Sequence, residues 1–171
     1  MIVKKLIPAL LIGAAVIAAS VAQQNQAVEI KLQSKPPVRK DKVVKTDAEW
    51  KRILTPVQYT ILRNKGTEAA FCGKFHDKKE PGIYICAGCK LPLFSNDHKF
   101  ESGTGWPSFY KPITPDAVWY KRDLTHGMDR IEILCARCDG HLGHAFEDGP
   151  KPTGWRYCLN SDAMLFEAAK K

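Results

Sequence analysis

The alternation of apolar and polar positions divides the chain into three parts. An unbroken apolar run covers residues 6–19. A Lys-rich stretch without regular apolar spacing follows, and from about residue 46 apolar residues recur with the periods of helices and strands. We therefore expect a targeting segment at 1–22, a tether at 23–45 and one folded domain at 46–171.

Two short helices are expected at the start of the domain. Thr46 or Asp47 can cap the first one. Thr55-Pro56 restarts the helix, because Thr can accept the N-cap hydrogen bond and Pro loses no hydrogen bond at the first helical position. Gly66 is the expected C-terminal stop. These helices are expected only to pack against a core.

Beyond residue 67 the pattern changes to short strands separated by turns. Gly and Pro recur between short runs of β-branched and aromatic residues, which is typical of an all-β body. We expect a mainly β fold of two small antiparallel sheets, led in by the two helices. The runs that predict strands most clearly are Gly82–Ile85, Ala117–Tyr120, Arg130–Leu134 and Trp155–Leu159.

The N-terminal run has the features of a secretory signal. Lys4 and Lys5 precede it, and the small residues of Ser20-Val21-Ala22 suit cleavage after Ala22. An uncleaved anchor is the alternative, because residues 6–22 are only slightly short of a membrane-spanning helix. We expect an exported protein, periplasmic or secreted, or one that stays tethered to the membrane through residues 6–22.

The net charge of +8 does not indicate nucleic-acid binding once the charges are located. Residues 31–52 hold eight Lys or Arg against three acidic residues, whereas residues 53–171 hold 16 against 14. The excess therefore lies mainly in the tether, which also contains Pro36-Pro37. A basic linker of this kind is typically solvated and can lie near an anionic membrane surface. We expect no nucleic-acid partner.

Four of the six cysteines form two Cys-x-x-Cys pairs that predict a metal site. Each pair follows a predicted strand, and together they offer the four thiolates of a tetrahedral zinc site. Because four sulfur ligands leave no position for water, one zinc ion would be structural. Two disulfides are the alternative in an oxidising compartment. The pairs are Cys86 with Cys89 and Cys135 with Cys138.

Cys158 is the candidate nucleophile. If the stretch around it is a strand, Arg156, Cys158 and Asn160 share one face, opposite Tyr157 and Leu159. The neighbouring guanidinium favours the thiolate, which is the reactive form of a cysteine. A buried, inert cysteine is the alternative.

Cys72 is the sixth cysteine and lies in a loop-like segment after the helices. A second thiol can resolve an oxidised one by forming a disulfide with it. A buried bystander and a permanent disulfide with Cys158 are the alternatives.

Two further segments hold candidate pocket residues. Trp106 lies in a loop rich in Gly and Pro, where it can line a small apolar pocket or pack in the core. His141 and His144 follow the second Cys pair closely. Because four sulfurs already complete a zinc site, these histidines suit hydrogen bonding or proton donation near neutral pH, or a purely structural role.

Together these motifs resemble the B-type methionine sulfoxide reductases. The matching segments run in order from about Trp50 to Leu165. The resemblance implies a β-tent fold and reduction specific for the R epimer of methionine sulfoxide in proteins. The matching segments are Gly66-Thr67-Glu68, the two Cys-x-x-Cys pairs, Phe100–Phe109, His126-Gly127-Met128, Cys138–Phe146, Asp148-Gly149-Pro150 and Arg156–Ser161.

The resemblance also implies residue roles. Cys158 resembles the nucleophile, which becomes a sulfenic acid. Trp106 resembles the wall that packs on the substrate methyl group, and the four paired cysteines resemble the zinc ligands. His141, His144 and Asn160 resemble the polar set around the sulfoxide oxygen. The substrate-binding residues would be Trp106, His141, His144, Phe146, Arg156 and Asn160.

Thr104 departs from the family pattern, because many members carry the resolving cysteine there. Some members place it in the loop after Gly-Thr-Glu, which is where Cys72 stands. The resemblance then implies an intramolecular disulfide that a thioredoxin-like donor reduces by exchange. The partners would be oxidised proteins and this donor, and we expect a monomer. Two rival functions are a zinc-knuckled β-tent that only binds or acts as a chaperone, and a basic zinc ribbon for nucleic acid.

Overall fold

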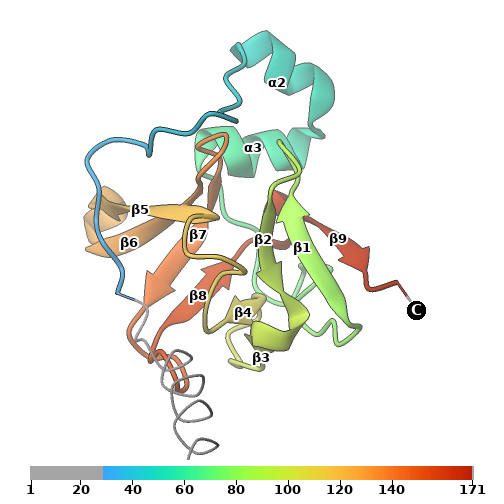
Figure 1. Cartoon of the computed structure of the whole chain (residues 1–171), viewed down its shortest axis with the longest axis vertical. Coiled ribbons are helices and arrows are strands. Elements are labelled where there is room, and N and C mark those ends of the chain that lie inside the picture. Colours follow the sequence, from blue (N-terminus) through green and yellow to red (C-terminus); the bar gives the residue numbers. More distant parts are fainter. Residues whose placement is uncertain (1–28, 171) are drawn as a thin grey trace, which may run out of the picture.

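The structure is a computed structural model that describes residues 29–170 (Figure 1). Two helices precede nine strands within this range. The helices are α2 (Asp47–Ile53) and α3 (Pro56–Asn64). The strands are β1 (Gly82–Cys86), β2 (Pro92–Ser95), β3 (Lys99–Phe100), β4 (Ser108–Phe109), β5 (Val118–Asp123), β6 (Arg130–Cys135), β7 (His141–Phe146), β8 (Arg156–Leu159) and β9 (Met164–Ala168).

The strands form two antiparallel sheets, which confirms the expected mainly β fold. Three strands make the smaller sheet in the order β2-β1-β9, and six make the larger one in the order β3-β4-β8-β7-β6-β5. The four strands expected most clearly correspond to β1, β5, β6 and β8. The pattern did not single out β2, β3, β4, β7 or β9, because these segments lack a clean apolar alternation.

Both helices begin where the sequence places their caps. Thr46 and Thr55 each form a capping box, accepting a hydrogen bond from the backbone three residues on. The end of α3 corrects the expected stop, since Lys65 and not Gly66 adopts the left-handed conformation, with φ of 57°. Glycine still suits position 66, because a Cβ there would lie 2.9 Å from the Thr60 methyl carbon and 3.1 Å from the Thr60 carbonyl oxygen.

Buried aromatic side chains join the two sheets. The Phe94 ring of β2 lies 4.8 Å from the Phe109 ring of β4, centroid to centroid, and the Tyr84 ring of β1 lies 5.0 Å from it. Tyr157 of β8 packs on Phe94 at 5.8 Å. All four residues are fully buried, so the core fixes β8 against the smaller sheet.

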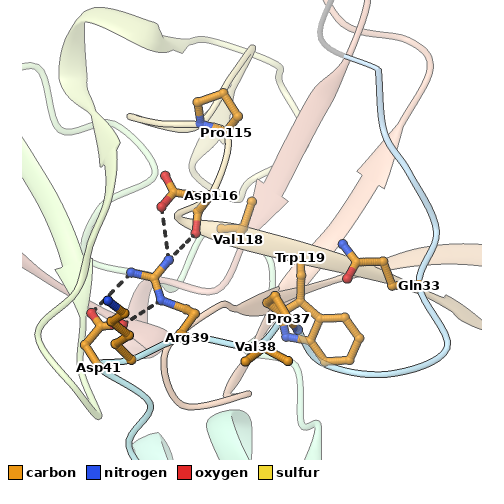
Figure 2. A pocket seen from close by; sticks show the side chains of 10 residues that line it. Gln33, Pro37, Val38, Arg39, Asp41, Pro115, Asp116, Val118 and Trp119 are labelled. Atoms are coloured by element: carbon orange, nitrogen blue, oxygen red, sulfur yellow. Dashed lines mark hydrogen bonds and ion pairs between the residues drawn. The ribbon is translucent and has the colours of Figure 1, made fainter.

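Residues 29–45, which we call the strap, lie along the domain and do not run free as a solvated linker would. Leu32 forms a parallel bridge with Tyr120 of the edge strand β5, and the Gln33 amide donates to the Tyr120 carbonyl at 2.8 Å. Figure 2 shows Arg39 between Asp41 and Asp116, with which it forms hydrogen bonds of 2.8 to 3.2 Å. The strap therefore covers part of an otherwise unpaired sheet edge.

The expected signal or anchor at 1–22 lies outside the described residues. None of the helices within residues 29–170 combines the length and apolar character needed to cross a bilayer.

Candidate active site and metal site

The architecture places Cys158 in the middle of the larger sheet. Its strand β8 lies between β4 and β7, where Cys158 pairs with Ser108 on one side and His144 on the other. Tyr157 and Leu159 point into the core and are fully buried, while Cys158 is partly exposed. The expected alternation along this strand is therefore present, and Cys158 is not a sealed core residue.

Burial and hydrogen bonding act on the Cys158 thiol in opposite directions. Burial raises its pKa above 9.0, whereas Arg156 and Thr104 favour the thiolate and Asp148 disfavours it. The guanidinium of Arg156 is itself held by two 2.8 Å hydrogen bonds to Asp148 and stacks 4.4 Å from the Phe146 ring centroid. The expected effect of Arg156 is thus present, but burial is the larger influence in the free protein.

A cavity of about 130 Å³ opens at Cys158. It brings together five residues expected from the sequence, namely Trp106, His144, Phe146, Cys158 and Asn160. Arg156 and His141, also expected, do not line it. Its remaining lining residues are Thr67, Arg130, Gly143 and Leu159.

Trp106 and Asn160 are fixed by the segment that follows α3. The indole N–H of Trp106 donates to the Glu68 carbonyl at 3.1 Å. The side-chain oxygen of Asn160 accepts from the Glu68 amide at 3.0 Å, and its NH2 group donates to the Leu142 carbonyl at 3.1 Å. The Glu68 carboxylate in turn accepts from the Ser161 amide at 2.7 Å. Glu68 thus orients both sides of the cavity.

The two histidines are held by different carboxylates. The Nε2 atom of His144 lies 2.8 Å from an oxygen of Asp123, which also receives a 2.7 Å bond from Arg130. Burial lowers the pKa of His144, while Asp123 acts to raise it. Burial alone would raise the pKa of Asp123, but Thr125, His144 and Arg130 hold it below its usual range.

His141 lies behind His144 and away from the cavity lining. Its Nδ1 atom is 2.9 Å from Glu132, and its ring centroid is 5.3 Å from that of His144. Lys65 also donates to Glu132 at 2.7 Å. Burial would raise the pKa of Glu132, but His141 and Lys65 lower it. The Nε2 atom of His141 is buried without a partner among the described residues.

Sequence reasoning missed several residues that shape this site, among them Asp123, Arg130, Glu132 and Gly143. Asp123 and Glu132 hold the histidines, and a lone acid inside the apolar run of β6 is the signal that could have revealed Glu132. Gly143 allows β7 to approach β8, because a Cβ there would lie 2.0 Å from the Cys158 carbonyl oxygen. Gly143 carries no signal without knowledge of the strand pairing.

Cys72 is an exposed, free thiol in the loop after α3. The amide of its neighbour Phe71 donates to the Gly105 carbonyl at 2.8 Å, so this loop contacts the segment that carries Thr104 and Trp106. Two of the alternatives can now be judged: Cys72 is not buried, and it is not bonded to Cys158.

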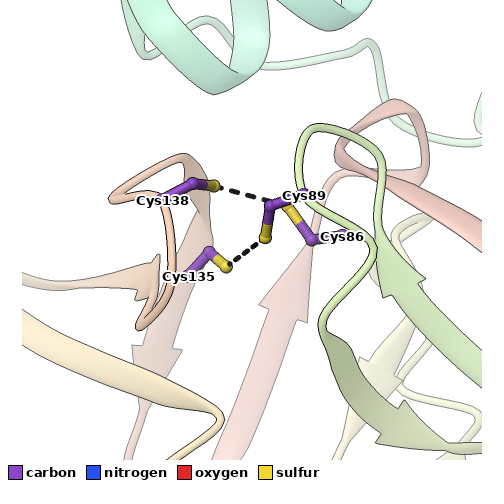
Figure 3. Close-up of side chains that lie close together, drawn as sticks. All are labelled: Cys86, Cys89, Cys135 and Cys138. Atoms are coloured by element: carbon purple, nitrogen blue, oxygen red, sulfur yellow. Dashed lines mark hydrogen bonds between the residues drawn. The ribbon is translucent and has the colours of Figure 1, made fainter. Parts of the chain in front are cut away.

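The four paired cysteines converge from the two sheets (Figure 3). Their sulfurs all lie within 4.8 Å of one another, with 3.7 Å between Cys86 and Cys138 and 3.5 Å between Cys89 and Cys135. Four sulfurs at zinc–sulfur bonds of about 2.3 Å would be about 3.8 Å apart in a tetrahedron. A disulfide requires about 2.05 Å, so the arrangement fits a shared metal ion and not two disulfides.

Comparisons with known proteins agree with this geometry. Residues 54–168 match a SelR domain. The chain is 55% identical over 125 residues to a peptide methionine sulfoxide reductase MsrB of Leptospira interrogans, covering 73% of this chain and 95% of that protein. It is 56% identical over 126 residues to the MsrB of Agrobacterium fabrum, covering 74% and 93% of the two chains.

Proposed function

The chain belongs to the SelR-domain family of MsrB-type methionine sulfoxide reductases, and on that premise we propose that it reduces the R epimer of methionine sulfoxide in proteins. The observation that carries the proposal is the position of Cys158, a partly exposed thiol in a cavity that aromatic and polar side chains line together. The aromatic side chains are those of Trp106 and Phe146, and the polar ones include those of His144 and Asn160.

The reaction uses the polarity of the sulfoxide group. Its sulfur carries partial positive charge and is attacked by the Cys158 thiolate, while its oxygen takes up a proton. The oxygen ends on Cys158 as a sulfenic acid, and the substrate leaves as methionine. Two electrons thereby pass from the cysteine sulfur to the substrate sulfur. A protonated His144, or a water that it holds, supplies the proton.

Some of the candidate residues would touch the substrate, and others would act on it only through a neighbouring residue. Trp106 packs on the substrate methyl group, and His144 and Asn160 face the oxygen. His141 supports His144 from behind, and Arg156 acts on Cys158 from the same strand. The cavity lining supports this division, because it includes Trp106, His144 and Asn160 and excludes His141 and Arg156.

Cys72 is the resolving thiol in this proposal. It attacks the sulfenic acid, forms a disulfide with Cys158 and releases water. A thioredoxin-like dithiol then reduces the disulfide by exchange. The exposure of Cys72, and the contact of its loop with the Gly105 segment, support this role. The step requires the loop to bring Cys72 to Cys158.

One structural zinc ion completes the proposed protein. Cys86, Cys89, Cys135 and Cys138 would hold it, and a centre with four sulfur ligands contributes stability without taking part in the reaction. The four sulfur positions support this assignment.

We further propose that the protein acts as an exported monomer, periplasmic or secreted, or tethered through residues 6–22. Its partners are oxidised proteins and a thioredoxin-like reductant. The charged start and apolar run of the N-terminus support export.

Turnover of the two separated epimers with a chemical dithiol tests the proposed activity. We expect the wild-type chain to convert the R epimer and to leave the S epimer, and Cys158→Ser to convert neither. With a thioredoxin-type donor, Cys72→Ser should stop after about one methionine per enzyme. Activity retained by Cys158→Ser would contradict the mechanism, and inactivity of the wild type on both epimers would favour a binding or chaperone module.

A further inference from the structure

A second cavity, of about 420 Å³, adjoins the one at Cys158. We call it the strap groove, because the strap residue Leu32 lines it together with Ile131, Ala145, Phe146 and Trp155. Arg130 and Phe146 line both cavities. Arg130 begins β6 and Phe146 ends β7, and since Ile131 pairs with Ala145, the two shared residues lie next to each other at one end of the sheet.

The cavity at Cys158, which we call the catalytic cavity, and the strap groove lie on opposite faces of the sheet and meet at that end. His144 and Cys158 are cross-strand neighbours on the catalytic face. Ala145 and Ile131 are neighbours on the opposite face, because adjacent strand residues alternate. A chain leaving the catalytic cavity over Arg130 and Phe146 therefore enters the groove. Because the two cavities share Arg130 and Phe146, the path between them crosses one pair of residues, which at about 3.3 Å per extended residue corresponds to about one to three residues.

Leu32 comes from outside the SelR domain, which begins at residue 54. Leu32 as a whole residue is 50% exposed, yet its backbone is held by the bridge to Tyr120 and by the adjoining 2.8 Å hydrogen bond from the Gln33 amide to the Tyr120 carbonyl. An apolar side chain fixed at the mouth of a groove offers a contact surface at little further cost in conformational entropy.

The charges around the groove do not select a charged occupant. The lining holds two basic residues, Arg122 and Arg130, and two acidic ones, Asp129 and Glu147, of which Glu147 is exposed to solvent. Arg122 forms two hydrogen bonds with Asp129, of 2.8 and 2.6 Å, and Arg130 pairs with Asp123 at 2.7 Å. A group bound in the groove would therefore interact with it mainly through apolar contacts with Leu32, Ile131 and Trp155.

We propose that the strap groove binds a large apolar side chain of the substrate polypeptide, one to three residues from the methionine sulfoxide. This inference rests on the proposed function and specifies its substrate: an extended segment with a neighbouring Leu, Ile or Phe, in preference to free methionine sulfoxide. Leu32 is then a specificity-determining residue that the strap adds to the family domain.

Peptide kinetics test the proposal. Peptides carry one R-methionine sulfoxide in a Ser and Gly background, with a single Leu moved through the three positions on either side. N-acetyl-methionine sulfoxide serves as the substrate without neighbours. For the full-length wild-type chain we expect kcat/KM to rise about 3- to 10-fold when Leu occupies one favoured position, as burial of a few methylene groups allows.

Leu32→Ala should remove this preference and leave the rate on N-acetyl-methionine sulfoxide unchanged. Val38→Ala is the matched control, because Val38 is a fully exposed strap residue outside the groove lining, and it should keep the preference. A wild-type enzyme indifferent to Leu at all six positions, or a preference that survives Leu32→Ala, would overturn the inference. Failure to reduce N-acetyl-methionine sulfoxide as well would count against the proposed function itself.

Discussion

At the scale of single residues, the reactivity of Cys158 depends on a balance of burial and hydrogen bonding. Burial raises the pKa of its thiol, and Arg156 and Thr104 oppose that rise. The thiolate fraction of the free protein therefore increases with pH into the alkaline range. In the proposed reaction, the partial positive charge of the bound sulfoxide sulfur would add to the groups that favour the thiolate.

Removing Arg156 should make Cys158 less reactive at a given pH. In a Cys72→Ser background, we expect Arg156→Met to shift the pH midpoint of Cys158 alkylation upward and to slow alkylation several-fold at pH 8, because the thiolate loses its nearest cation and keeps Asp148 nearby. Arg122→Met is the matched control, since Arg122 forms the same kind of pair with Asp129. An unchanged midpoint in Arg156→Met would contradict the assigned role.

Glu132 is expected to be a major contributor to stability among the polar residues near the site. Its side chain is 1% exposed and holds both His141 and Lys65. Glu132→Ala leaves a buried imidazole without its partner and should lower the free energy of unfolding by about 3 kcal/mol in urea titrations. The exposed Glu147, changed in the same way, should alter it by less than about 0.5 kcal/mol. Equal effects would refute this reading of Glu132.

The sequence allowed most of the residues that line the cavity to be predicted, but not the residues that hold them in place. Trp106, His144, Phe146, Cys158 and Asn160 were expected and line one cavity. His141 was expected to contact the substrate but lies behind His144, because its partner Glu132 is brought to it only by the pairing of β6 with β7. Partners that depend on strand register carry no local signal.

At the scale of elements, the close approach of β7 and β8 sets the geometry around Cys158. Gly143 of β7 pairs with Leu159 and faces the Cys158 carbonyl. The local pattern did not predict a strand at β7, since its two histidines and a glycine interrupt the apolar alternation. The helix starts could be predicted, because capping depends on residues close in sequence. The register of β7 could not be predicted, because it depends on the strands that pair with it.

Gly143→Ala should separate these two strands. The added Cβ would lie 2.0 Å from a backbone oxygen that cannot rotate away, so we expect a loss of about 2 to 4 kcal/mol in unfolding free energy and of most activity. Gly127→Ala is the comparison, because Gly127 has φ of 69° and open space around it. It should cost only the conformational strain of about 1 kcal/mol. Similar losses for the two variants would argue against a steric role for Gly143.

At the scale of the whole molecule, the four-sulfur site connects the two sheets. Cys86 ends β1 of the smaller sheet, and Cys135 ends β6 of the larger one. The strap contacts the turn that carries Cys135 and Cys138. Lys42 donates to Asp139 at 2.7 Å, and the Val43 amide donates to the Arg137 carbonyl at 2.8 Å. The spacing of the cysteines predicted this site, whereas nothing in the tether predicted its contacts.

Removing the proposed zinc ion should destabilise the fold without involving the reacting atoms. We expect about one zinc ion per chain by elemental analysis, and a fall in Tm of about 10 °C or more on chelation. Cys86→Ser should already have the lower Tm and respond little to the chelator. If the chain holds no metal and its four paired cysteines cannot be alkylated, those cysteines form disulfides instead.

Trapping the oxidised thiol tests the central claim most directly. The full-length Cys72→Ser chain is mixed with one equivalent of R-methionine sulfoxide and a sulfenic-acid reagent such as dimedone, and the modified residue is identified by mass spectrometry. The proposed mechanism predicts one methionine and one adduct per chain, with the adduct on Cys158. Methionine formed without an adduct on Cys158, or with the adduct on one of the four paired cysteines, would contradict the mechanism.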